Sequence, residues 1–149
     1  MSDLRLRPRM IGVDLGQARI GVAVSDELGL LAHPLETIPA GRDAARRIAQ
    51  IVQEKSADRV IVGLPRHMNG SVGAGAMDAL AFAEKLRGLL PCEVVTWDER
   101  LTTTAANRAL RDSGRKTRES RQLVDQVAAQ MILQGYLDSG RVTEIPETS

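Results

Sequence analysis

Short apolar runs alternate with longer amphipathic segments along this chain. Five runs have the length and the Val/Ile content of β-strands, and Gly16 marks a turn between the first two. The predicted strands are Met10–Asp14, Ile20–Ser25, Leu35–Ile38, Arg59–Val62 and Glu93–Trp97.

Four segments repeat their apolar residues with the period of an α-helix. The predicted helices are Asp43–Lys55, with Asp43 as N-cap, Ala76–Leu89, Thr102–Asp112 and Ser120–Asp138. Glycine and proline predict a turn over Gly63–Pro65, and the three glycines of the next stretch predict a loop over 66–75. Strands that alternate with helices after an opening hairpin predict an α/β fold with a mixed sheet covered by helices.

Length and composition predict one globular domain. The 149 residues are 43% hydrophobic and 26% charged, which is typical of a single soluble domain. We expect a structured core over about 10–138 and tails over 1–8 and 141–149. No apolar run approaches a membrane span or a secretory signal, and Cys92 is the only cysteine. These features favour a cytoplasmic protein without disulfides and without a membrane partner.

The net charge of the whole chain is +1, but one segment is strongly basic. Residues 100–121 hold seven basic and two acidic side chains, a net charge of +5, which suits a polyanionic partner. The aromatic residues number only three, Phe82, Trp97 and Tyr136. This scarcity argues against single-strand binders that stack bases on an aromatic sheet.

Several carboxylates occupy positions where solvated acids are uncommon. Asp14 ends the first predicted strand, and Asp98 and Glu99 end the last. Asp125 shares the apolar stripe of the last helix, because Ala128, Ala129 and Ile132 follow it at i+3, i+4 and i+7. If the first and last strands are parallel, their carboxyl ends share one edge of the sheet, where α/β proteins place their sites.

Converging carboxylates without histidine or cysteine suit a hard cation such as Mg²⁺ or Mn²⁺. Such ions can activate water for phosphodiester hydrolysis. Strand alternation allows only one of Asp98 and Glu99 to face the site, and position alone leaves the choice open. Each acid taken singly could also be structural, as a turn residue, a helix cap or a satisfied buried group.

Four motifs occur in order along the chain: GVDLGQARIGVAVSD at 12–26, VIVGLPRHMNG at 60–70, WDERLTT at 97–103 and LVDQVAAQMIL at 123–133. Together they resemble the YqgF-type family of Holliday junction resolvases and pre-16S rRNA nucleases. The resemblance implies an RNase H-like fold, with a mixed five-stranded sheet and helices on both faces. It also implies a metal-dependent endonuclease acting on branched DNA or precursor rRNA.

The resemblance assigns the catalytic and metal-binding roles to Asp14, Glu99 and Asp125. Related RuvC resolvases carry a fourth carboxylate one turn after the helix aspartate, where this chain has Ala128. We therefore expect one or two Mg²⁺ or Mn²⁺ ions, with substrate oxygens completing the coordination. Paired cuts in a junction would favour a symmetric homodimer.

Several polar residues near these motifs are candidates to bind phosphate. Arg19 follows the first turn, Arg66 lies in the glycine-rich loop, and Arg100, Thr102 and Thr103 follow Glu99 at a helix start, which favours anions. Each has a structural alternative, such as a solvated arginine or a helix cap. We define the basic arm as Arg115, Lys116 and Arg118, which we expect to bind the nucleic-acid backbone.

Two other functions fit parts of the sequence. The pattern from Asp14 to Gly21 matches the phosphate-binding hairpin of actin and sugar kinases, but 149 residues leave no room for the second domain that closes over ATP. The second alternative is a binding protein that acts as a scaffold in ribosome or transcription complexes and whose acids no longer have a catalytic role. Metal-dependent cleavage would separate the nuclease from the scaffold.

Overall fold

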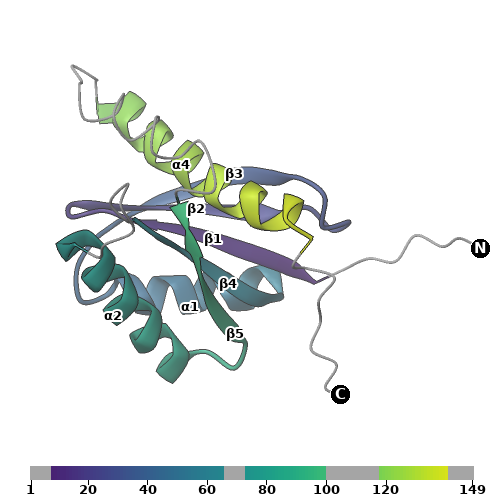
Figure 1. The fold of residues 1–149 in the computed structure, drawn as a ribbon, viewed down its shortest axis with the longest axis horizontal. Coiled ribbons are helices and arrows are strands. Elements are labelled where there is room, and N and C mark those ends of the chain that lie inside the picture. Colours follow the sequence, from purple (N-terminus) through teal and green to yellow (C-terminus); the bar gives the residue numbers. More distant parts are fainter. Residues whose placement is uncertain (1–7, 66–72, 100–117, 141–149) are drawn as a thin grey trace, which may run out of the picture.

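A five-stranded mixed sheet forms the centre of the molecule (Figure 1). The computed structural model describes residues 8–65, 73–99 and 118–140. The strand order is β3-β2-β1-β4-β5, with the first three strands antiparallel and β1, β4 and β5 mutually parallel. The strands are β1 (Arg9–Leu15), β2 (Arg19–Ser25), β3 (Ala32–Pro39), β4 (Ala57–Leu64) and β5 (Glu93–Asp98).

Helices cover both faces of the sheet. The helices α1 (Ala44–Lys55) and α2 (Ala74–Leu89) lie on one face, and α4 (Arg118–Asp138) crosses the other (Figure 1). Alternation along the strands divides the core accordingly. In β1, Ile11 and Val13 join the cluster under α1 and α2, whereas Met10 packs with the cluster under α4. This arrangement confirms the predicted RNase H-like architecture of a mixed five-stranded sheet with helices on both faces.

Several predicted boundaries differ from the observed ones. β3 begins three residues earlier than predicted and contains Pro34, which an edge strand tolerates. The predicted turn at Gly63–Pro65 is wrong in part, because Gly63 and Leu64 still belong to β4. α2 begins at Ala74, inside the predicted loop, and α4 begins at Arg118. The helix predicted over Thr102–Asp112 lies outside the described residues.

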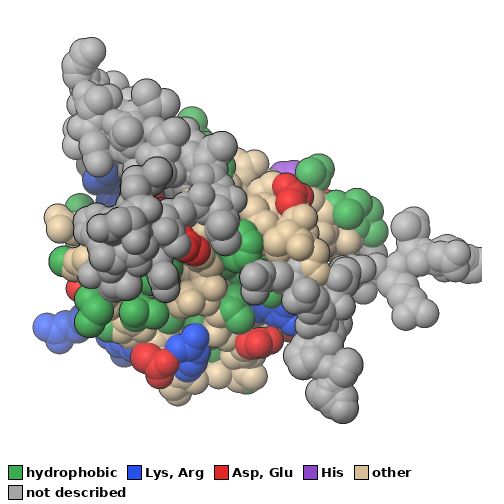
Figure 2. Space-filling view, viewed as in Figure 1, with side chains coloured by type: hydrophobic (Ala, Val, Ile, Leu, Met, Phe, Trp, Pro, Cys, Tyr) green, Lys and Arg blue, Asp and Glu red, His purple; other side chains and the backbone are tan. Residues whose placement is uncertain are grey.

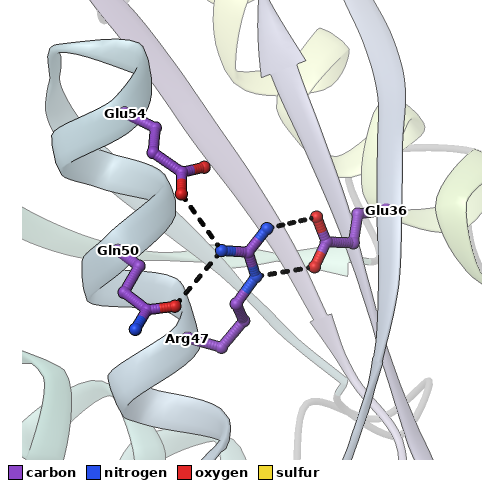
Figure 3. Close-up of polar contacts among 4 residues, drawn as sticks. All are labelled: Glu36, Arg47, Gln50 and Glu54. Atoms are coloured by element: carbon purple, nitrogen blue, oxygen red, sulfur yellow. Dashed lines mark hydrogen bonds and ion pairs between the residues drawn. The ribbon is translucent and has the colours of Figure 1, made fainter.

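A charged cluster ties α1 to the edge strand β3 (Figure 3). The guanidinium of Arg47 donates from Nε and Nη2 to the two carboxylate oxygens of Glu36, each at 2.8 Å. Its Nη1 donates to Gln50 and Glu54. The hydrogen bonds to Glu36 raise the pKa of Arg47 above its ordinary value, so the pair stays charged. The cluster thus links α1 to β3 on the face of the sheet opposite α4.

None of the helices in the described ranges is both long and apolar enough to cross a membrane.

Candidate active site

The carboxyl ends of β1 and β5 lie at one edge of the sheet. Both strands run parallel to β4, which lies between them. Asp14 is near the end of β1 and is only 1% exposed, and Glu99 directly follows β5 and is 3% exposed. The structure therefore brings these two acids to a shared edge, as the parallel arrangement predicts.

Asp14 lies between two glycines on the neighbouring strands. In the antiparallel register it faces Gly21 of β2. On the other side, Val13 pairs with Val62 of β4, so the next residue, Gly63, lies beside Asp14. We call Gly21, Asp14 and Gly63 the glycine–aspartate row. Its two glycines leave the sheet without side chains on either side of the aspartate.

Gly21 allows the backbone of α4 to approach β2. A Cβ at Gly21 would lie 2.0 Å from the carbonyl oxygen of Asp125 and 2.4 Å from its carbonyl carbon. These distances are far below van der Waals contact, so no other residue fits here without displacing the helix. The glycine thus allows Asp125, which is 4% exposed, to lie against β2, next to the strand β1 that carries Asp14.

Gly63 makes room for Glu99 on the other side of the row. A Cβ at Gly63 would lie 2.7 Å from Oε2 of Glu99 and 2.4 Å from Cδ1 of Ile132. The Glu99 carboxylate therefore extends over β4 towards β1, on the face that α4 covers. Asp98, the alternative that position alone left open, belongs to β5 and is less buried.

Small and apolar side chains let α4 lie flat on this face. Ala128, Ala129 and Ile132 are each no more than 1% exposed, which confirms the predicted sheet-facing stripe of Asp125. Gly12 extends the contact, since a Cβ there would lie 2.7 Å from Cβ of Leu133. A carboxylate on such a stripe is costly to bury unless charge or hydrogen bonds compensate it.

Three glutamines that sequence reasoning did not single out fix the position of α4 along β3. Gln126 Nε2 donates to Oγ1 of Thr37 at 3.1 Å, and Gln130 Nε2 donates to the carbonyl of Ala32 at 2.9 Å. Gln134 Oε1 accepts from the backbone N–H of Ala32 at 2.8 Å. Their spacing of four residues places them on one side of the helix, and this periodicity is the signal that could have identified them.

Arg19 provides a positive charge at the helix aspartate. Its Nε donates to Oδ2 of Asp125 at 2.6 Å. A tight turn places Arg19 at the start of β2, where the N–H of Gly16 donates to the Arg19 carbonyl at 3.0 Å. Arg19 was predicted to meet a phosphate, whereas in this structure it pairs with a carboxylate, and its side chain remains 30% exposed.

The donor set fits a hard divalent cation in kind, since Asp14, Glu99 and Asp125 offer only carboxylate oxygens. Across residues 8–65, 73–99 and 118–140, however, no three Asp, Glu, His or Cys side chains stand close enough, as they are, to hold one ion. A bound ion would therefore need the carboxylates to draw together, and it would share the Asp125 carboxylate with Arg19, which now contacts Oδ2.

The other predicted substrate residues fall largely outside the described part of the chain. Arg118 is the first residue of α4. Those beyond the described residues are Arg66, Arg100, Thr102, Thr103, Arg115 and Lys116.

Comparison with known proteins identifies the family. The model of the RuvX family, described as Holliday junction resolvase, matches residues 8–139. The chain belongs to this family. Membership confirms the predicted class of the protein, a nuclease that hydrolyses phosphodiester bonds.

Relatives and solved structures agree with the family. A Nocardia farcinica protein named "Putative pre-16S rRNA nuclease" is 51% identical, covering 89% of this chain and 78% of its own length. A Bacillus mycoides protein of the same name is 44% identical, covering 88% and 98%. Thermus thermophilus RuvC, solved with a Holliday junction, has a TM-score of 0.57 at 14% identity, covering 90% of this chain and 97% of its own. The fowlpox virus resolvase, solved with junction DNA, has a TM-score of 0.50 at 10% identity, covering 88% and 97%. At these identities the two structures show a shared fold.

The close contact at Gly21 gives a stability prediction. Gly21→Ala should lower the free energy of unfolding by at least about 2 kcal/mol, because the new methyl group would overlap the Asp125 backbone. Urea denaturation followed by circular dichroism measures the change.

Gly88→Ala is the matched control. Gly88 lies within α2, and a Cβ there would meet nothing within 4 Å. Alanine should therefore stabilise the helix by up to about 1 kcal/mol. Equal effects of the two substitutions would show that the glycine–aspartate row is not a close-packed contact.

Proposed function

We propose that this nuclease depends on a divalent cation held by Asp14, Glu99 and Asp125. The observation that carries the proposal is the burial of three carboxylates around the glycine–aspartate row, at the carboxyl edge of the sheet. Burying three acids together costs folding free energy, and a cation is the partner that would offset their repulsion. Family membership supports the same chemistry.

The cation is Mg²⁺ or Mn²⁺, because the donors are all carboxylate oxygens. Asp14, Glu99 and Asp125 would hold one or two such ions, which would supply Lewis-acid activation of water and of the scissile phosphate. Ala128 is buried against the sheet and offers no ligand one turn after Asp125. Substrate oxygens would therefore complete the coordination of a second ion.

The remaining predicted residues would orient the nucleic acid. Arg66, Arg100, Thr102 and Thr103 would donate to phosphates next to the carboxylates. In the view of Figure 2, basic side chains among the described residues are interspersed with acidic ones. We assign backbone affinity to the basic arm, whose three residues lie in the basic segment of the chain.

The substrate is structured nucleic acid, either the 5′ segment of precursor 16S rRNA or a four-way DNA junction. The names of the relatives favour RNA, and the family description favours the junction. Backbone contacts alone do not discriminate between them.

The two substrates can be distinguished by incubating the purified protein and Mn²⁺ with each of them and comparing the rates of cleavage. Paired cuts in a junction would favour a homodimer, because a symmetric dimer presents two sites to the two strands. With a single cysteine, we expect the protein to act in the cytoplasm.

A catalytically weak scaffold in ribosome biogenesis or transcription is the alternative function. It requires binding without turnover. Retention of all three buried acids argues against it, because vestigial acids would be free to drift to apolar residues that cost less to bury.

Neighbouring carboxylates offer a direct test of the catalytic assignment. Glu99→Gln should lower kcat by at least about a hundredfold, because an amide is a poor ligand for a hard cation. Asp14→Asn should do the same while leaving nucleic-acid affinity nearly intact. Asp98→Asn removes the same charge one residue away and should change kcat by less than about threefold. Single-turnover cleavage in Mg²⁺ measures all three, and normal cutting by the Asp14 variant would refute the assignment.

Cation binding should stabilise the fold. Mn²⁺ at about 100 times its Kd should add about 2.7 kcal/mol to the free energy of unfolding of the wild type. A double variant, Asp14→Asn with Asp125→Asn, should lose nearly all of this gain. Thermal melts with Mn²⁺ and with a chelator measure the difference. An equal rise in Tm in both proteins would show that the ion binds elsewhere.

The basic arm should set affinity rather than turnover. Changing its three residues to alanine should reduce the slope of log K against log salt by roughly 0.7–0.9 for each phosphate that the variant no longer neutralises. Junctions and structured RNA should be affected alike, and cleavage at saturating substrate should change little. Fluorescence anisotropy at several salt concentrations measures the slope.

A matched control removes the same charges elsewhere. Arg42, Arg46 and Lys55, in and just before α1, are also two arginines and one lysine, on the face opposite α4. Their replacement by alanine should leave the salt slope unchanged. The assignment of the arm fails if the two triple variants bind alike, or if turnover collapses while affinity holds.

A further inference from the structure

The contact between Arg19 and Asp125 has a consequence for how the ion enters. The Arg19 Nε lies 2.6 Å from Oδ2 of Asp125, and the Asp125 side chain is only 6% exposed. At this distance and burial the pair is a strong charge-assisted interaction. The Arg19 guanidinium thus offsets the negative charge of the Asp125 carboxylate in this structure.

The guanidinium and a divalent ion compete for the same carboxylate. A bound cation would take an oxygen lone pair of the Asp125 carboxylate, and one oxygen of that carboxylate already accepts a hydrogen bond from Arg19. A cation on that oxygen would also repel the guanidinium strongly in a poorly solvated setting. Binding of the cation to Asp125 therefore weakens the contact between Asp125 and Arg19, and the contact with Arg19 weakens binding of the cation.

We propose that Arg19 acts as an exchangeable counterion, which occupies Asp125 until a divalent cation replaces it. The inference rests on the proposed function, since it assumes that Asp125 is a metal ligand. It makes Arg19 a positioning residue that acts through Asp125.

Nucleic acid would favour the exchange. The Arg19 side chain is 30% exposed, so the guanidinium can swing outward from the edge of the sheet. A substrate phosphate at that edge would accept its hydrogen bonds in place of Asp125. Phosphate and cation would then bind cooperatively, each making the other tighter by the same factor. The cation site would thereby be completed when substrate arrives.

Metal affinity without nucleic acid tests the exchange. Isothermal titration of the full chain with Mn²⁺ at fixed ionic strength gives Kd for each variant. Arg19→Gln should bind Mn²⁺ roughly tenfold more tightly than the wild type, because the competitor is gone. Arg19→Lys keeps the charge but loses the planar donor, and should lie between the two. A residue that merely holds Asp125 in shape would give the reverse order.

Arg9→Gln is the matched control. Arg9 also begins a strand and also pairs with an acid, Glu27, at 3.3 Å, and its side chain is 33% exposed. It lies at the opposite end of β1 from Asp14. Its replacement removes the same charge and should leave the Mn²⁺ affinity within about twofold of the wild type. If Arg19→Gln and Arg9→Gln raise the Mn²⁺ affinity equally, the effect comes from the change in net charge alone, and the proposal is overturned.

The outcomes separate this inference from the proposed function. If Mn²⁺ binds the wild type and Arg19→Gln equally, or binds the variant more weakly, the exchange is refuted and the metal site stands. If the wild type binds no Mn²⁺ and cleaves without it, both are refuted. Arg19→Gln leaves Asp125 without its guanidinium, so circular dichroism must first show that it folds. If it does not, Arg19→Lys decides, and affinity equal to or weaker than wild type refutes the exchange.

Discussion

The backbone contact between Gly21 and Asp125 is the constraint on which the candidate site depends. A helix normally keeps its distance from a sheet because side chains separate them. Here β2 has no Cβ at the point of contact, and the Asp125 carbonyl oxygen lies only 2.0 Å from the place where that atom would be. The backbone of α4 therefore lies close against β2 at Gly21, the residue that pairs with Asp14 of the neighbouring strand β1. The position of Asp125 in the candidate site therefore depends on the lack of a side chain at Gly21.

The same principle operates on both sides of Asp14. Gly21 accommodates the helix and Gly63 accommodates Glu99. The hydrogen bonds from Gln126, Gln130 and Gln134 then prevent α4 from sliding along β3. Buried carboxylates on such a rigid frame are costly without a counter-charge, and Arg19 supplies one at Asp125. The site thus combines close packing, which favours stability, with three buried acids, which oppose it.

Sequence reasoning located the carboxylates because local patterns carry that information. An acid at the end of an apolar run predicted Asp14, and the period of the last helix predicted that Asp125 faces the sheet. It could not choose between Asp98 and Glu99 by position alone, since that choice depends on what lies over the next strand. It misjudged Gly63 as a turn residue, because glycine signals turns and close contacts alike. The Arg19–Asp125 pair joins residues far apart in the chain, so no local pattern revealed it.

The most direct measurement of the central claim is the position of the ion itself. Crystals grown with Mn²⁺ and measured at the manganese absorption edge would locate it by anomalous scattering. We predict a peak beside the glycine–aspartate row, within coordination distance of Asp14, Glu99 and Asp125, with Arg19 withdrawn from Oδ2 of Asp125. A peak elsewhere, or an intact Arg19–Asp125 pair with no peak at saturating Mn²⁺, would contradict it.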